Sequence, residues 1–392
     1  MIDIVSIDQC VLCGSCVDSC PVGAISFEKE HHGSKYPQID GQRCIGCQRC
    51  EQACPVLNIA EDASRQEPMG YAAMHTDDAV RKESSSGGVF AALADAVISA
   101  GGYVCGAVLT EDLSVEHIVS NDPKQIVRMR GSKYVQSRMT GVYREIEKLV
   151  KQNIPVLFSG CPCQAAALKT FLGNDYPSLY IADVICHGIP SISSWRTYLI
   201  IQEKRYKSRV EDVQFRDKSK GWHSSSVKLR FSNGKELYVR NNEDIYYKNA
   251  FIGNVTLKES CYQCVFRGCR SGSDLTLGDF WGAEVALPDM DDNKGLSAVL
   301  VHTEKGKELL ERIGVEKRNV SYELILRGNK NLEQSPLVSP KRSPYYACAE
   351  KEGEVAAMES FLVESIAQRY RRKIRYLLRR MKHAVTGKKT LY

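Results

Sequence analysis

The chain has 392 residues, of which 43% are hydrophobic and 26% are charged, a composition typical of a soluble globular protein with two or three domains. Its net charge of +6 is due to the basic residues at the C-terminal end. Residues 365–392 carry ten Lys and Arg and no Asp or Glu, so the rest of the chain has 43 basic and 47 acidic residues. This balance excludes a broadly basic body of the kind that binds nucleic acid, and we expect no nucleic-acid partner.

The first ten residues, MIDIVSIDQC, lack the basic and apolar regions of an export signal. No stretch approaches the 18 apolar residues of a membrane-spanning helix. We therefore expect a cytoplasmic protein. The 16 cysteines could form a disulfide scaffold or bind metal, and a long chain without an export signal favours metal-binding thiolates.

Eight of these cysteines form two similar runs, CVLCGSCVDSCP at residues 10–21 and CIGCQRCEQACP at residues 44–55. Each run has the spacing C-x2-C-x2-C-x3-C-P of bacterial two-cluster ferredoxins, in which the fourth cysteine binds the other cluster. Two complete runs that end in Cys-Pro fit structural zinc sites poorly. We predict that one 4Fe-4S cluster is held by Cys10, Cys13, Cys16 and Cys54, and the other by Cys44, Cys47, Cys50 and Cys20.

Residues 57–72 are polar and predict a linker, which is followed by alternating helices and strands. SSSGG at residues 84–88 precedes a helical stretch at 89–100, and YVCGAVL at 103–109 predicts a strand. A serine- and glycine-rich helix start can bind an anion or can simply cap the helix. The segment GSKYVQS at 131–137 could hold a phosphate and a ring, or could be an exposed loop.

Two predicted strands end at cysteines. PVLFSG at 155–160 is followed by Cys161 and Cys163, and LYIADVI at 179–185 is followed by Cys186. Helices are expected at 165–172 and from about residue 191. Open α/β sheets bind their ligands at the carboxyl ends of the strands, although a free cysteine such as Cys186 could also be a buried apolar residue.

The middle of the chain is rich in strands, since SSSVKLRF at 224–231 and KELYVR at 235–240 flank a Ser-Asn-Gly turn. A third cysteine group, Cys261, Cys264 and Cys269, precedes DLTLGDFWG at 274–282. This group could be half of a zinc site or a redox pair, and Cys163 and Cys186 are the candidates to complete it.

Seven motifs occur in the order SSSGGVF, GSKYVQS, FSGCPCQ, DVICHG, FRDKSKGW, CYQC and TLGDFWG. Together they resemble the family of coenzyme F420 hydrogenase/dehydrogenase beta subunits, in a bacterial form with an N-terminal two-cluster ferredoxin domain. Members of that family are iron–sulfur flavoproteins that carry FAD and an additional 4Fe-4S cluster. They include deazaflavin-reducing subunits and reductases of chlorophyll-type pigments.

The resemblance implies which residues hold the additional cofactors. The chain departs from the family at Cys161, where the family usually has threonine, so Cys161 could be a ligand in place of Cys163, and Cys269 is a further thiol that could substitute. The implied ligands of the third cluster are Cys163, Cys186, Cys261 and Cys264. The implied FAD-binding residues are Ser85, Ser86, Gly87, Gly88, Gly131, Ser132, Lys133, Tyr134, Gln136 and Ser137.

The expected fold class is α+β or α/β, with a ferredoxin domain at 1–60, a linker at 61–75 and a mixed α/β domain at 76–345 that binds FAD and a 4Fe-4S cluster. Residues 346–392 are expected to form a basic amphipathic helix and tail, since apolar residues recur at helical spacing among arginines. This helix could pack on the body, lie on an anionic membrane surface or contact a partner.

The predicted function is an FAD-dependent iron–sulfur oxidoreductase. It would pass electrons from a donor, such as a ferredoxin or a hydrogenase or dehydrogenase subunit, through the clusters to FAD and on to an organic substrate or a deazaflavin-like coenzyme. The alternative is an electron-transfer subunit of a larger complex without a small-molecule substrate of its own. His187 and Asp279 are candidate proton donors in catalysis, and each could equally be structural.

Overall fold

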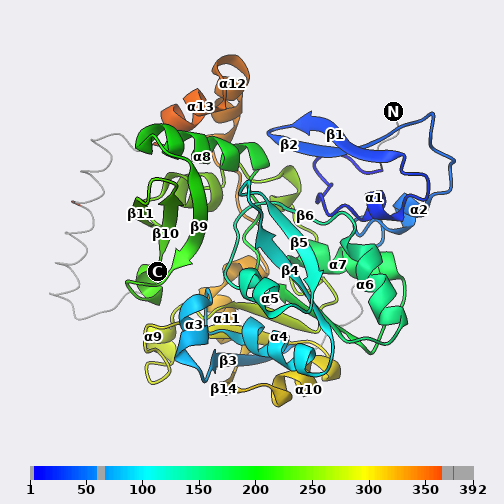
Figure 1. The fold of residues 1–392 in the computed structure, drawn as a ribbon, viewed down its shortest axis with the longest axis vertical. Helices are drawn as coiled ribbons and strands as arrows, with labels where there is room; N and C mark the ends of the chain where they lie inside the picture. Colours follow the sequence, from blue (N-terminus) through cyan, green and yellow to red (C-terminus); the bar gives the residue numbers. More distant parts are fainter. Residues whose placement is uncertain (1–3, 60–66, 364–373, 375–392) are drawn as a thin grey trace.

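The computed structural model describes residues 4–59, 67–363 and 374, and its largest element is a nine-stranded sheet (Figure 1). The order of its strands is β14-β3-β13-β12-β8-β7-β4-β5-β6. The strands are β3 (Met69–His75), β4 (Tyr103–Leu109), β5 (Val115–Ser120), β6 (Ser137–Arg138), β7 (Val156–Gly160), β8 (Leu179–Val184), β12 (Leu275–Asp279), β13 (Ser297–Val301) and β14 (Val315–Val320).

The centre of this sheet is parallel and its flanks are mostly antiparallel. β12, β8, β7 and β4 pair in parallel, whereas β13, β3 and β14 continue the sheet by antiparallel pairing. In the β7–β8 pair, Gly160 lies opposite Asp183, so these two strands end side by side. The prediction of a mixed α/β domain is confirmed, and the cysteines that follow β7 and β8 emerge at one edge.

Helices cover both faces of the sheet. α4 (Val89–Ser99) and α10 (Glu304–Arg312) pack with one set of alternating strand residues, and α6 (Val142–Lys151) and α7 (Pro162–Leu172) pack with the other set. The remaining helices of this part are α3 (Asp78–Glu83), α5 (Pro123–Met129), α9 (Ala283–Ala286), α11 (Tyr322–Gly328) and the 3-10 turns Trp222–Ser224, Glu259–Cys261 and Lys330–Leu332.

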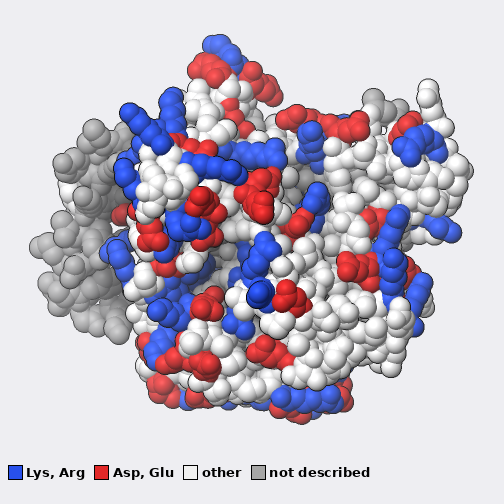
Figure 2. Space-filling view, viewed as in Figure 1, with Lys and Arg blue, Asp and Glu red and all other residues white. Residues whose placement is uncertain are grey.

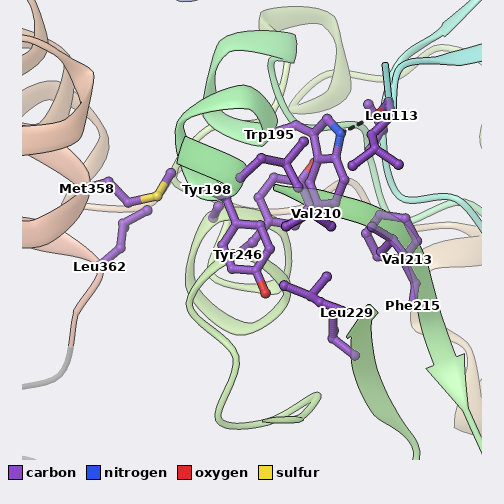
Figure 3. Packing of buried hydrophobic residues seen from close by; sticks show 14 of the residues in the cluster. Leu113, Trp195, Tyr198, Val210, Val213, Phe215, Leu229, Tyr246, Met358 and Leu362 are labelled. Atoms are coloured by element: carbon purple, nitrogen blue, oxygen red, sulfur yellow. Dashed lines mark hydrogen bonds between the residues drawn. The ribbon is translucent and has the colours of Figure 1, made fainter. Parts of the chain in front are cut away.

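A second core lies beside the main sheet and is centred on Trp195 (Figure 3). It is built by the antiparallel sheet β11-β10-β9, by α8 (Ile192–Tyr206), by the π-helix Ile245–Ile252 and by two C-terminal helices. The Trp195 indole Nε1 donates a hydrogen bond of 2.7 Å to the carbonyl of Leu113. The strands are β9 (Val210–Asp217), β10 (Ser226–Phe231) and β11 (Glu236–Arg240), and the helices are α12 (Arg342–Glu352) and α13 (Glu354–Phe361).

The C-terminal boundary predicted at residue 346 falls inside α12. Tyr345, Tyr346, Met358 and Leu362 are buried in the second core, so α12 and α13 belong to the body rather than to a separate tail. Their apolar residues obtain their partners from α8, which lies far away in the sequence. The predicted basic amphipathic helix, apart from Ile374, lies outside the described residues.

The N-terminal part forms a small unit with α1 (Ser15–Ser19), α2 (Arg49–Gln52) and the hairpin β1 (Ile25–His31) and β2 (Ser34–Ile39). It lies against α6 and α7 (Figure 1). Tyr143 of α6 donates a hydrogen bond to the carbonyl of Cys13, and the backbone N–H of Gly141 donates to the carboxylate of Asp18. The unit is therefore docked on the larger domain by its own cysteine loop.

The linker predicted over residues 61–75 is too long at its C-terminal end, because β3 already begins at Met69. Ala72 and Ala73 are fully buried between β13 and β14. The small apolar residues that follow the polar segment gain their burial from strands more than 200 residues away, which the local composition does not reveal.

Positive and negative side chains are interspersed over the face shown in Figure 2, in keeping with the nearly balanced charge of the body. Among the helices of the described residues, none has both the length and the apolar character needed to cross a bilayer.

Trp195 provides a test of the second core. Trp195→Ala should lower the free energy of unfolding by about 3–5 kcal/mol, because it removes a large buried ring and leaves the Leu113 carbonyl without its donor. Ile200→Ala on the same helix, at a side chain that is 51% exposed, should change it by at most about 0.5 kcal/mol. Urea unfolding followed by circular dichroism measures both values, and equal losses would contradict this account of the core.

Candidate functional site

The first cysteine site consists of Cys10, Cys13, Cys16 and Cys54. All four are buried and line one small cavity of about 20 Å³. This is the combination predicted from the sequence, in which the last cysteine of the second run joins the first three of the first run. Burial raises the pKa of the Cys10 thiol to about 12, so without a bound group these sulfurs would be neutral.

The second cysteine site consists of Cys44, Cys47, Cys50 and Cys20, and it lies at the surface. Cys44 and Cys47 are exposed, while Cys20 and Cys50 pack in one apolar cluster. Ile45, which follows Cys44 directly, is 63% exposed. The two runs have the same spacing, but only this site faces solvent.

The third cysteine site consists of Cys163, Cys186, Cys261 and Cys264, which line a cavity of about 50 Å³. Cys163 lies in the first turn of α7, Cys186 follows β8, and the other two lie in the loop that begins at the 3-10 turn Glu259–Cys261. Cys269 lines the same cavity. The structure therefore brings the four predicted ligands together from three segments of the chain.

Cys161 has a different position from Cys163. It lines a larger neighbouring cavity and not the one that the third cysteine site encloses. A hydrogen bond with the Cys161 thiol lowers the pKa of Cys186, although burial opposes this. This arrangement favours Cys163 over Cys161 as a member of the third cysteine site.

The spacing of the thiols bears on the zinc alternative. Four sulfurs around one zinc ion, each about 2.3 Å from the metal, would lie about 3.8 Å apart. Among the described residues, no three cysteine sulfurs lie within 4.8 Å of one another, and the groups compact enough for a single ion contain only His, Glu and Asp. None of the three cysteine sites is therefore among the compact groups of the described residues.

Two cations flank the third cysteine site. The side chain of Lys258 is only 4% exposed, and its Nζ donates a hydrogen bond of 2.7 Å to the carbonyl of Val11 in the first cysteine loop. Arg267 donates to the carbonyls of Cys186 and His187. These charges offset the negative charge that thiolates would place in a buried cavity.

The larger cavity, of about 290 Å³, opens beside the third cysteine site and shares Cys163, Cys186 and Lys258 with its wall. Its volume is near the lower end of the range of roughly 300–1,000 Å³ that is usual for ligand sites. Of the ten residues predicted to bind a cofactor, all but Gly87 line it: Ser85, Ser86, Gly88, Gly131, Ser132, Lys133, Tyr134, Gln136 and Ser137.

Hydrogen bonds join the motifs around this larger cavity. The backbone N–H of Ser132 donates to the Ser85 hydroxyl at 2.7 Å, although the two residues are 47 positions apart. Gln164 donates from Nε2 to the Ser137 hydroxyl at 2.8 Å and accepts from the backbone N–H of Cys161. The loops at residues 84–88 and 131–137 therefore form one wall of the larger cavity. The sequence alone left open whether the first only caps a helix and whether the second is an exposed loop.

The wall of the larger cavity contains buried polar atoms that lack a partner within the part of the chain that the structure describes. These atoms are Arg130 Nε, His117 Nδ1 and Gln136 Oε1. Lys133 donates from Nζ to the carbonyls of Arg128 and Arg130, and desolvation lowers its pKa to about 7. Buried polar groups normally have partners, so these atoms indicate a polar ligand, and the cations suit an anionic one.

Gly87 has a structural role that the sequence did not reveal. A Cβ atom at this position would lie 2.4 Å from the carbonyl oxygen of Ala73 and 2.7 Å from the backbone nitrogen of Ser297. Only glycine allows the start of α4 to approach β3 and β13 this closely. Gly87 therefore fixes the position of Ser86 and Gly88, which do line the cavity.

The two candidate proton donors are held by neighbouring side chains. His187 Nε2 lies 2.7 Å from the amide oxygen of Asn254, and Asn331 donates to His187 Nδ1 at 3.0 Å. Burial lowers the pKa of His187. A neutral ring with both nitrogens engaged is fixed in one tautomer, which favours the structural alternative for this residue.

Asp279 lines the larger cavity at the end of β12, but its carboxylate is paired. It accepts hydrogen bonds from Arg216 at 2.8 Å and from the Trp222 indole at 3.0 Å. Both carboxylate oxygens are thus occupied by donors of the protein. The geometry again favours a structural role.

Sequence reasoning missed Lys258, Arg267, Arg130 and His117 as residues of the site. Each is a single polar residue without a motif of its own. Only the position of Lys258, three residues before the Cys261–Cys264 pair, offered a signal, and no spacing rule assigns a role to a lysine there.

Comparison with known proteins identifies the family. Residues 155–323 match the model for the C terminus of the coenzyme F420 hydrogenase/dehydrogenase beta subunit, and residues 70–144 match the model for its N-terminal part. Residues 9–58 match a 4Fe-4S dicluster domain. The two beta-subunit matches together span more than half of the chain.

Two individual relatives illustrate the similarity. One subunit of the F(420)H(2) dehydrogenase of Methanosarcina mazei is 24% identical over 327 residues, which cover 79% of this chain and 84% of the relative. A chain of the xenon-derivatised F420-reducing [NiFe] hydrogenase complex from Methanosarcina barkeri aligns with a TM-score of 0.47 and 17% identity, over 70% of this chain and 91% of that chain.

These matches define an iron–sulfur protein with an electron-transfer domain. The chain belongs to the family of coenzyme F420 hydrogenase/dehydrogenase beta subunits and carries a 4Fe-4S dicluster domain at its N-terminal end. The resemblance seen in the sequence motifs is confirmed.

Gly87→Ala tests the structural role of this glycine. The added methyl group would meet two backbone atoms at less than 3.0 Å, so we expect a loss of about 1–3 kcal/mol in the free energy of unfolding. Gly314→Ala is the control, because a Cβ atom there meets nothing within 4 Å. Urea unfolding of both variants measures the effect. An unchanged urea midpoint in Gly87→Ala would show that the neighbouring backbone moves enough to accommodate the methyl group.

Proposed function

We propose that this chain is an FAD-dependent iron–sulfur oxidoreductase that passes electrons between a redox partner protein and an organic substrate or a deazaflavin-like coenzyme. The observation that carries the proposal is that two cavities share a wall. Cys163 and Cys186 line both of these cavities. One cavity is lined by the third cysteine site and the other by the two loops with hydroxyl groups and a lysine.

The third cysteine site would hold a 4Fe-4S cluster through Cys163, Cys186, Cys261 and Cys264. The four cysteines that line this one cavity supply the thiolate set that a 4Fe-4S cluster requires, which supports a cluster here. Arg267 and Lys258 would compensate the charge of the thiolates, and Arg267 also holds the loop around Cys186 through the backbone. Cys161 would remain a hydrogen-bonding neighbour of Cys186.

The larger cavity would hold FAD. Lys133 and the serine hydroxyls suit a pyrophosphate, and the ring of Tyr134, which packs 4.8 Å from the ring of Phe251, provides an aromatic surface. When bound, FAD would connect the single electrons of clusters with the two-electron reduction of an organic molecule. His187 and Asp279 would hold the wall in place through their partners rather than donate protons.

The exposed second cysteine site is where a redox partner protein would approach. Its exposed thiols and the exposed apolar side chain of Ile45, next to Cys44, support a protein contact there. The similarity to a subunit of an F(420)H(2) dehydrogenase supports a partner within a larger assembly. The second candidate function is therefore an electron-transfer subunit whose substrate is converted on another chain. A cytoplasmic location remains a prediction.

The test is iron and flavin per chain in protein purified without oxygen. We expect about twelve irons and one FAD, because three 4Fe-4S clusters and one flavin are proposed. Cys163→Ser should lower the iron to about eight per chain, whereas Cys161→Ser should leave it at about twelve. Of these two cysteines, Cys163 lines the cavity of the third cysteine site and Cys161 does not.

Other outcomes have definite meanings. A native protein with about eight irons and no flavin would contradict the proposal and leave an electron carrier. If Cys161→Ser loses iron and Cys163→Ser does not, the ligand assignment is wrong. Turnover of a deazaflavin by the isolated chain with a reduced viologen dye favours the enzyme, and a fully loaded but inactive chain favours the electron-transfer role.

Lys133 makes FAD binding depend on pH. Its pKa of about 7 in the empty site would rise when a pyrophosphate binds next to it, so binding takes up a proton above pH 7. The affinity of the flavin-free protein for FAD should therefore be constant below pH 7. It should then fall by up to about tenfold per pH unit as the pH rises through and above 7.

Titration by flavin fluorescence from pH 6 to pH 9 measures this dependence. Lys133→Arg keeps its charge over the whole range and should bind FAD with little change between pH 6 and pH 9. The same slope in Lys133→Arg as in the unsubstituted protein would remove Lys133 from the explanation.

A further inference from the structure

Lys258 occupies a position that connects two cysteine sites from different domains. Its backbone N–H donates to the carbonyl of Ile189, close to Cys186 along the chain, and its Nζ donates to the carbonyl of Val11, next to Cys10. Lys258 and Val11 both line the cavity of the third cysteine site and the larger cavity. A single ammonium group is thus buried at the contact between the two domains.

The ammonium group lies between the cysteine sites of both domains. Lys258 lines the cavity of the third cysteine site together with Cys163, Cys186, Cys261 and Cys264. It reaches the first cysteine site through the carbonyl of Val11, which lines that site's cavity beside Cys10. Lys258 therefore belongs to the wall of the third site and contacts the first through one backbone group.

Arg267, the other cation of this region, provides a comparison. It lines the cavity of the third cysteine site, and its guanidinium donates to carbonyls of the larger domain. The interactions of Lys258 reach the ferredoxin loop as well. The adjacent residue, Glu259, also contacts the N-terminal unit through a 2.7 Å hydrogen bond with His32, which fixes the backbone that carries Lys258.

We propose that Lys258 is a positioning residue whose fixed positive charge raises the reduction potentials of the first and third clusters, and raises that of the third more. The inference rests on the proposed third cluster. A positive charge stabilises the reduced, more negative form of a nearby cluster, and burial between the two sites keeps this effect from being screened. Lys258 would thereby draw an electron from the ferredoxin domain into the larger domain.

The experiment uses the full chain with its clusters, purified without oxygen, and compares Lys258→Met with Lys258→Arg. A redox titration followed by electron paramagnetic resonance measures the potential of each cluster. In Lys258→Met, the ratio of reduced to oxidised third cluster at a fixed potential should fall at least tenfold, which corresponds to about 59 mV for one electron. The first cluster should shift by less and the exposed second cluster should not shift.

The controls separate charge from structure. Lys258→Arg should keep the native potentials, because it retains the charge. Lys317→Met on the edge strand β14 removes another lysine that donates to a backbone carbonyl and should shift no cluster. If Lys258→Met loses iron, Lys258→Gln replaces it, since the amide can still donate to the Val11 carbonyl without a charge.

Two results would overturn the inference. If an uncharged variant keeps about twelve irons and has the native cluster potentials, the charge has no effect. If Lys258→Arg shifts the potentials as much as the uncharged variant does, the shift does not come from the loss of charge. A native chain with only about eight irons would instead contradict the third cluster itself, and with it the proposed function on which this inference rests.

Discussion

The parallel pairing of β7 with β8 is the constraint on which the rest of the site depends. Gly160 lies opposite Asp183, so both strands end at the same edge of the sheet. The chain leaves β7 through Cys161 and Cys163 and leaves β8 through Cys186. β12 pairs in parallel with the other side of β8 and brings Asp279 to the same edge. One register therefore aligns the third cysteine site with the larger cavity.

That edge would be unstable if it held only thiolates. Burial raises the pKa of Cys163, Cys261 and Cys264, which means that the protein interior disfavours their charged forms. Lys258 and Arg267 supply the compensating charges, and both also hold the backbone through carbonyl groups. The short segment from Lys258 to Cys264 thus contributes two thiols, a cation and a domain contact, which couples the docking of the N-terminal unit to the electrostatics of the site.

Local features of this protein could be predicted from the sequence, whereas features that depend on distant partners could not. The spacing of the cysteine runs was enough to propose Cys10, Cys13, Cys16 and Cys54 as one set, because the ligands of a ferredoxin follow a short repeat. The strand at 103–109 and the turn before β11 also followed from local pattern. By contrast, β3 was taken for linker, since its small residues are buried only by β13 and β14. Lys258 was missed because a lone lysine belongs to no pattern until Val11 is placed beside it.

The cysteine sites differ in exposure. The second cysteine site faces solvent, the first is buried against α6, and the cysteines of the third are half-buried beside the larger cavity. The two runs of the ferredoxin domain are nearly identical in spacing, so this difference arises from docking and not from the runs themselves. The contacts of Tyr143, Gly141 and Lys258 with the first loop decide which of two equivalent sites is covered. The docking contacts therefore give a symmetric two-site domain a direction, with one end available to a protein and the other turned toward the interior of the larger domain.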